Sequence, residues 1–434
     1  MRAGLLALGC VVLATMTAAA PAAPGPGEDA AAAAPAIKPL TLELAATDAM
    51  PPAQPPPGPD APTPPGQPTK PAAPPEGYKT GACHLLLTGD AEVTFTALKH
   101  SKSMWEGELG LLFLIQFNDR LLAEVAIDTS IASMPLGGEP DRNLTLAHAN
   151  LSYRINDRLT VAAGILHVPF GLHMQHFGAP WINQFPDDPL PYADRGLAPD
   201  VALGVVLTGA AQVGPNSRIT YSFYVTDGAE LSTQDPGAAG DLTMDRFHNF
   251  EYVNRNQGAK AVGGRLACLP CPDLEVGFSV QGSKVEPEHF KDTNQFLFGI
   301  HAAYFREFQQ VKGQIRARAE WIWSNVDERT FDPTGALGFG PLRYNNNRNG
   351  GYWQAGYRPT RCGNAVLANT EFLIRYDRLN VSENAPSGGS EDRWTPGVAY
   401  WITPSMVIKA AYEYDKMQGS PADNLLIVQF AIGF

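Results

Sequence analysis

The sequence contains no apolar run of about 18 residues beyond its first twenty positions, and only 18% of its 434 residues are charged. A helical membrane protein is therefore excluded, because a transmembrane helix needs about 20 consecutive apolar residues. Lys and Arg do not cluster, and the net charge is −12. Nucleic acid is excluded as a partner, since phosphate binding requires grouped cations. The composition is still consistent with an acidic protein of a cell envelope.

The sequence motifs of common enzymes are also missing. There is no Gly-x-Ser-x-Gly elbow, no His-Glu-x-x-His motif and no glycine-rich phosphate loop. His173 and His176 have the spacing of metal ligands on a helix, with His167 nearby, but no Cys or carboxylate stands at ligand spacing beside them. We expect these to be rim histidines in a protein that is not an enzyme and needs no metal or cofactor.

The N-terminal region predicts export. Met1 and Arg2 precede an apolar stretch and then small residues, which is typical of a secretory signal peptide covering residues 1–20 and cut between Ala18 and Ala23. Residues 21–77 hold eighteen of the 38 prolines, a composition that favours extended chain and cannot bury a core. We expect a disordered Pro/Ala-rich periplasmic linker there, or alternatively a ligand for a periplasmic partner.

Beyond Cys83, apolar residues recur at every second position, as they do when one face of a strand meets an apolar medium. Ile219, Tyr221, Phe223 and Val225 alternate in this way with polar residues. Sixteen such segments begin near residues 87, 106, 121, 143, 159, 201, 217, 259, 274, 295, 311, 351, 365, 393, 406 and 424. Their lengths suit tilted membrane strands.

The connections between these segments alternate between short and long. Short turns such as 118–120, 156–158 and 403–405 follow the even segments, whereas long loops such as 169–200 follow the odd ones. Outer-membrane barrels have this rhythm, and closure satisfies backbone groups that hydrocarbon would leave unpaired. We therefore predict an all-β fold: a 16-stranded antiparallel transmembrane β-barrel over residues 83–434 in the lipid of the outer membrane, with both ends in the periplasm.

The last segment is apolar at alternate positions from Leu426 to Phe434. This ending resembles the signal that the outer-membrane barrel assembly machinery recognises. We expect Phe434 to act as an assembly signal.

Two stretches resemble the phosphate-selective porin O/P family. The first is AAGILHVPFG at 162–171, followed by Asp-Arg-Gly at 194–196 and the strand 204–209. The second is FLIRYDRLN at 372–380, followed by 395–409 and the terminal strand. The resemblance implies a homotrimeric sixteen-stranded channel. It does not imply phosphate as the substrate, because that family uses an arginine ladder, whereas the charges on the polar faces here are about balanced in sign.

The residues expected to line the pore come from the polar faces of the strands and from one loop. The strand residues are Arg154, Arg218, Lys312, Arg316, Arg318, Glu320, Glu371 and Arg375. The loop 169–200 contributes Asp187, Asp188, Asp194 and Arg195, with bulky aromatics beside them. Porins fold a loop inward after the fifth strand, so we expect an acidic eyelet here. The alternatives are an outward cap, and strand charges that only satisfy one another.

Cys268 and Cys271 flank a short turn on the periplasmic side. In an oxidising compartment we expect a local disulfide, with zinc binding and free thiols as alternatives. The predicted function is passive or weakly selective diffusion of small hydrophilic solutes or ions. The alternative is a structural barrel that anchors the Pro-rich arm to a periplasmic partner or sheathes another protein.

Overall fold

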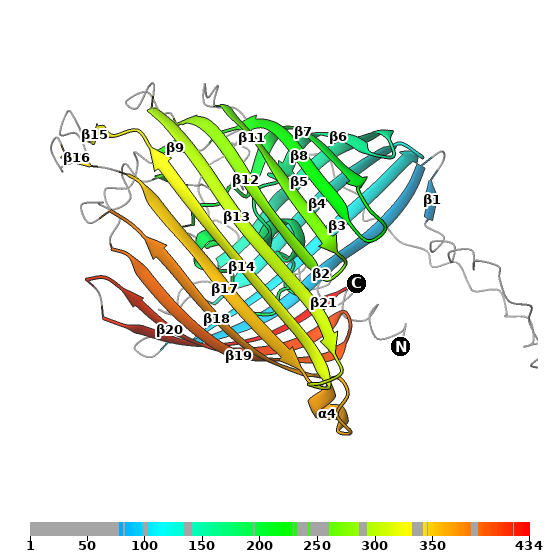
Figure 1. Cartoon of the computed structure of the whole chain (residues 1–434), viewed down its shortest axis with the longest axis vertical. Helices are drawn as coiled ribbons and strands as arrows, with labels where there is room; N and C mark the ends of the chain where they lie inside the picture. Colours follow the sequence, from blue (N-terminus) through cyan, green and yellow to red (C-terminus); the bar gives the residue numbers. More distant parts are fainter. Residues whose placement is uncertain are drawn as a thin grey trace, which may run out of the picture. The chain divides into compact units, whose positions relative to one another are not determined.

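Sixteen long strands close into a barrel in the computed structural model (Figure 1). The structure describes residues 78–80, 83–98, 103–133, 141–193, 196–228, 230–231, 242–243, 260–285, 293–331, 342–344, 346–382, 389–419 and 421–434. The expected signal peptide, 1–20, and linker, 21–77, lie outside these residues. No described helix is long and apolar enough to cross a bilayer.

The long strands are β2 (Cys83–Leu98), β3 (Met104–Asn118), β4 (Leu121–Ala132), β5 (Asp141–Asn156), β6 (Leu159–His167), β7 (Val201–Gln212), β8 (Arg218–Asp227), β11 (Lys260–Cys271), β12 (Leu274–Val285), β13 (Thr293–Phe308), β14 (Gly313–Val326), β17 (Arg348–Arg358), β18 (Thr370–Asn380), β19 (Glu391–Thr403), β20 (Met406–Met417) and β21 (Asp423–Gly433). The short ones are β1 (Tyr78–Thr80), β9 (Glu230–Leu231), β10 (Leu242–Thr243), β15 (Arg329–Phe331) and β16 (Leu342–Tyr344). The helices α2 (His173–His176), η1 (Leu190–Tyr192) and α4 (Ala365–Ala368) each span one turn or less.

Closure is achieved between the first and last long strands. β2 pairs with β3 on one side and with β21 on the other, and Asp90 stands opposite Gly433. The backbones of Gly89 and Phe434 exchange two hydrogen bonds of 3.1 and 3.0 Å. Each long strand therefore has two antiparallel neighbours and no edge is left unpaired. The predicted 16-stranded antiparallel barrel is confirmed.

Most strands begin within a few residues of the predicted positions, but two of the predicted starts need correction. The strand predicted from 365 begins at Thr370, because residues 365–368 form α4. The side chain of Asn364 caps this helix by accepting the N–H groups of Val366 and Leu367, at 2.9 and 3.2 Å. Lys312 does not belong to a strand: it has a left-handed backbone with φ 51, and β14 starts after it.

The two ends of the barrel differ. At one end, which we call the short-turn end, lie the turns 119–120, 157–158, 272–273 and 404–405 together with Phe434. At the other, the long-loop end, β8 ends at Asp227 and β11 begins at Lys260, and likewise β14 ends at Val326 and β17 begins at Arg348. The connection 168–200 starts and finishes at this end, where the Val168 N–H donates to the Asp200 carbonyl at 2.8 Å.

The two faces of each strand also differ. On β13 the alternate residues Phe296 and Ile300 are exposed on the outside, whereas Gln295 and His301 are buried inside. On β18 Phe372 and Ile374 are exposed outside, and Glu371, Arg375 and Asp377 are buried inside. An apolar outer wall and a charged inner wall follow directly from the period-two pattern of the sequence.

Candidate functional site

The connection 168–200, which we call the inner loop, contacts the inner wall of the barrel. Gly171 has φ 72, and a Cβ at this position would clash with Glu320 and Tyr192. The Gly171 N–H donates to the Ser279 hydroxyl at 2.9 Å, and the Leu172 N–H donates to Glu320 at 3.0 Å. Glycine therefore allows a close turn that joins the loop to β12 and β14.

Two apolar clusters pack the inner loop against the wall. The first cluster joins Phe170, Leu190 and Tyr192 to residues on seven strands, including Leu297 and Ile322. In the second, the fully buried Phe185 packs with Leu373, Ala399, Trp401, Val407, Ala411 and Ala431. Burying a side chain such as Phe contributes about 1.5–3 kcal/mol. The loop is thus held by a core of its own inside the barrel.

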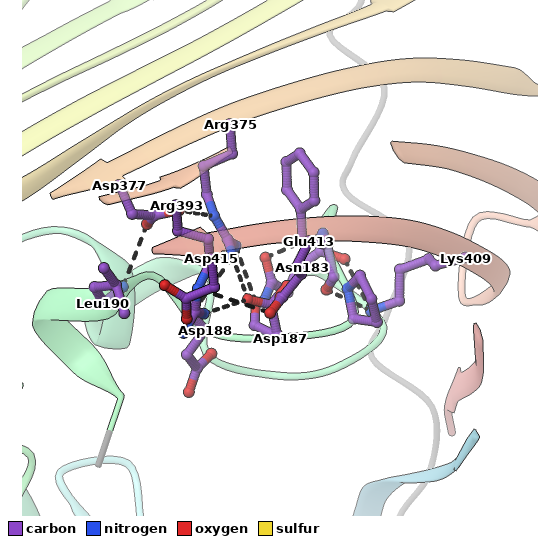
Figure 2. A network of polar contacts seen from close by, with 12 residues as sticks. Asn183, Asp187, Asp188, Leu190, Arg375, Asp377, Arg393, Lys409, Glu413 and Asp415 are labelled. Atoms are coloured by element: carbon purple, nitrogen blue, oxygen red, sulfur yellow. Dashed lines mark hydrogen bonds and ion pairs between the residues drawn. The ribbon is translucent and has the colours of Figure 1, made fainter. Parts of the chain in front are cut away.

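A charged network ties the middle of the inner loop to β18, β19 and β20 (Figure 2). Arg375 is fully buried; it pairs with Asp187 of the loop and, at 2.8 Å, with Asp377 of its own strand. Arg393 reaches the same Asp187 carboxylate at 3.3 Å. Burial alone would raise the pKa of Asp187, but Arg375 and Arg393 hold that pKa below its ordinary value. Asp187 is therefore a paired, largely buried anion.

Further carboxylates surround the same two arginines. Arg393 lies 3.3 Å from Glu391, 3.3 Å from Asp415 and 3.7 Å from Glu413. Asp377 also accepts the Leu190 N–H, at 3.2 Å. Since acidic groups outnumber the arginines, this network carries no surplus positive charge toward the lumen.

Two more groups of polar contacts, around Lys409 and around Gln184, hold the tip of the inner loop. The Lys409 ammonium donates to the carbonyls of Pro180, Asn183 and Phe185 at 2.8, 3.3 and 2.9 Å. Gln184 donates to Glu371 at 2.6 Å and accepts from Arg318 at 2.8 Å. A buried lysine that finds three carbonyls has its donors satisfied, which fixes the loop position.

The structure brings together part of the predicted residue set. The inner loop is contacted by Arg318, Glu320, Glu371 and Arg375. Arg316 is linked to the loop through Glu371, because its Nε lies 3.8 Å from that carboxylate. Asp188 lies 3.0 Å from His173 and is about one-third exposed.

The other predicted residues lie elsewhere. Arg154 and Arg218 are exposed at the short-turn end, and Lys312 lies in a turn. Placing Lys312 on the pore-facing strand was wrong, because β14 begins one residue later. Asp194 and Arg195 lie outside the described residues.

A neighbouring part of the wall carries an acidic group that the sequence did not predict as a cluster. Gln429 joins it to the inner loop, because it donates to Glu92 at 2.6 Å and to the Pro186 carbonyl at 3.1 Å. Asp90, Glu92, Glu108 and Asp128 lie on the inner faces of β2, β3 and β4, which we call the acidic wall. Glu92 stands directly opposite Glu108. A Cβ at Gly110 would lie 3.0 Å from Asp90 and 3.1 Å from Asp128, so both carboxylates approach the same glycine. The cluster depends on the register between neighbouring strands as well as on the alternation of inward and outward residues along each strand.

Neither cysteines nor histidines form a metal site among the described residues. The thiols of Cys83, Cys268, Cys271 and Cys362 are free in the structure. Both Cys268 and Cys271 lie within β11, so the turn expected between them is wrong, but the pairing of β11 with β12 is irregular from Cys268 to Cys271. A disulfide between them stays a prediction, to be checked on the oxidised protein.

No protein-family model and no curated protein match the sequence. Among solved structures, it is similar to a Salmonella typhi OmpF complex, with TM-score 0.53 and 12% identity over 81% of this chain and 98% of that chain. It is also similar to the outer membrane channel DcaP of Acinetobacter baumannii, with TM-score 0.52 and 11% identity over 82% and 99%. OmpT of Vibrio cholerae gives TM-score 0.50 and 12% identity over 83% and 100%.

At such low identity the similarity concerns the fold alone. The chain has a sixteen-stranded barrel of the outer-membrane porin type. The narrower resemblance to phosphate-selective porins stays a prediction.

Proposed function

We propose that the protein is an outer-membrane porin through which small hydrophilic solutes or ions diffuse. One observation carries this proposal: a closed barrel whose outer face is apolar and whose inner face is charged also contains a firmly anchored loop. An apolar outer surface requires lipid, and charged groups inside require water. The porin-type fold supports the proposal, and none of this arrangement requires a cofactor.

We propose an outer-membrane location with the short-turn end toward the periplasm. An even number of strands brings both ends of the barrel to one side, where a linker at 21–77 would lie. The rings of Trp353, Tyr376 and Trp394 form an outward-facing group, with centroids 4.8–6.3 Å apart. Such aromatic groups suit a membrane interface.

We propose that the inner loop narrows the bore, and that the acidic wall, which Gln429 joins to the loop at Glu92, borders the lumen that remains. The arginines behind the loop are matched by carboxylates, whereas Glu92 and Glu108 face each other across a strand pair. Fixed charges bias ions within a Debye length of about 8–10 Å. The channel should therefore prefer cations.

The test is the reversal potential of purified protein in a planar bilayer under a salt gradient. We expect stepwise conductance with cation preference, and a shift toward anions in the double variant Glu92→Gln with Glu108→Gln. The matched control, Asp119→Asn with Asp157→Asn, removes exposed turn carboxylates outside the lumen. An equal shift in both variants would remove the role of the acidic wall. A barrel that never conducts would instead favour the structural role.

Two partners complete the proposal. The chain assembles as a homotrimer, as the resemblance implies, and Phe434 contributes to recognition by the barrel assembly machinery. Phe434 closes the barrel through its backbone while its residue remains 41% exposed. Deleting Phe434 should reduce the amount of assembled barrel in the membrane fraction.

A further inference from the structure

A cavity of about 430 Å³ lies between the inner loop and the strands β14, β17 and β19. Its lining includes Trp181, Arg316, Arg358, Asn369, Trp401 and Thr403. Its volume is within the range of pockets that hold small organic ligands, roughly 300–1,000 Å³. The residues Asn369, Thr403 and Pro404 place it toward the short-turn end.

Two guanidinium groups give this cavity a positive charge. Arg358 donates to the carbonyl of Ala368 at 2.8 Å and to the Asn369 side chain at 2.7 Å. It makes no ion pair with a described carboxylate, in contrast to Arg375 and Arg393. In the described part of the chain no carboxylate therefore contacts its guanidinium group, and Glu371 acts on it only at longer range.

Among the described residues, Arg316 has one carboxylate near it, Glu371. Its Nε lies 3.8 Å from Glu371, but Glu371 already accepts from Gln184 and from the Trp401 indole at 3.0 Å. The Arg316 guanidinium lies 5.3 Å from the Phe305 ring centroid and 5.6 Å from that of Trp401. Two cations against one occupied carboxylate leave a surplus positive charge beside flat aromatic surfaces.

We propose that this cavity binds a small aromatic carboxylate. Arginine forks match planar carboxylates in two parallel hydrogen bonds, and indole rings stack against planar apolar rings. The carboxylate would lie between Arg316 and Arg358, and the ring between Trp181 and Trp401. The Asn369 oxygen already accepts from Arg358, so its amide group remains as a further donor. The cavity lies inside the barrel that the proposed function makes a channel, but binding to it needs no conductance.

The experiment is calorimetric titration of the full-length mature protein in detergent with benzoate. We expect saturable binding that weakens at least about tenfold, or ~1.4 kcal/mol, in Arg358→Gln and in Arg316→Gln. The control, Arg361→Gln, removes a nearby exposed arginine that pairs with Glu307 at 2.8 Å outside the cavity. Because Arg358 also holds Asn369, its replacement could disturb the backbone around residue 369. The Arg316 variant and a Trp181→Leu variant leave that contact intact and test the site separately.

Parallel titrations with acetate, cyclohexanecarboxylate and inorganic phosphate separate charge from ring stacking. Benzoate binding stronger than all three supports the proposal. Phosphate binding as strong as benzoate, unchanged benzoate binding in both arginine variants, or no saturable benzoate binding would each overturn it. If the protein conducts but does not bind benzoate, the proposed ligand site is rejected and the proposed function stands. If it binds benzoate but does not conduct, the proposed function is rejected and the ligand site stands.

Discussion

Replacing Arg375 with Gln removes the cation at the centre of the charged network. Arg375 is fully buried, pairs with Asp187 and Asp377, and lies 4.7 Å from the Phe185 ring centroid. Without it, Asp377 loses its ion-pair partner, and among the described residues Asp187 keeps Arg393 alone. Removing one partner of a buried ion pair costs about 3–5 kcal/mol, because a desolvated charge is left behind.

This cost should appear as local opening of the inner loop rather than unfolding of the barrel. The bonds of Lys409 to the loop carbonyls and the cluster around Phe170 do not involve Arg375. At about 1.4 kcal/mol per factor of ten, the opening equilibrium of residues 183–190 should rise on the order of a hundredfold to several thousandfold. Residues 168–176 should change little.

The assay is hydrogen exchange followed by mass spectrometry on the detergent-solubilised barrel. The matched control is Arg378→Gln on the same strand, because Arg378 is 43% exposed and its pair with Asp392, at 3.2 Å, is a surface pair worth about 0–1 kcal/mol. If the peptide 183–190 exchanged equally fast in both variants, the network would not anchor the loop and our reasoning would be refuted.

Four further predictions concern the loop, acid, the cysteines and heat. Removing residues 181–193 should raise single-channel conductance severalfold, since this segment lies inside the barrel. Because Arg375 lowers the pKa of Asp187, exchange protection of 183–190 should persist at about pH 5 and decline only below the ordinary value of 3.8. If the predicted disulfide forms, alkylation without reductant should leave Cys268 and Cys271 unmodified, and mass analysis would detect this. Unboiled and boiled protein should migrate differently on a gel, because detergent alone does not open a closed barrel.

The sequence by itself determined the architecture. Alternation of apolar and polar residues is a local property with period two, so it can be counted strand by strand without any tertiary information. The sixteen segments and their short and long connections therefore predicted the barrel. Local chemistry also explains the errors: Asn364 starts a helix where a strand was expected, and Lys312 takes a turn conformation before β14.

Only the tertiary structure decided which charges meet. The alternation of inward and outward residues along a strand places Arg375 and Glu108 on inner faces, but it does not predict which side chains they contact. Asp187 and Arg375 are 188 positions apart, and their pairing depends on how the inner loop turns at Gly171 and packs through Phe185. The acidic wall likewise depends on strand register, because a shift of one residue would turn Glu92 away from Glu108. Long-range register and loop packing are cooperative properties of the closed barrel, and no local pattern encodes them.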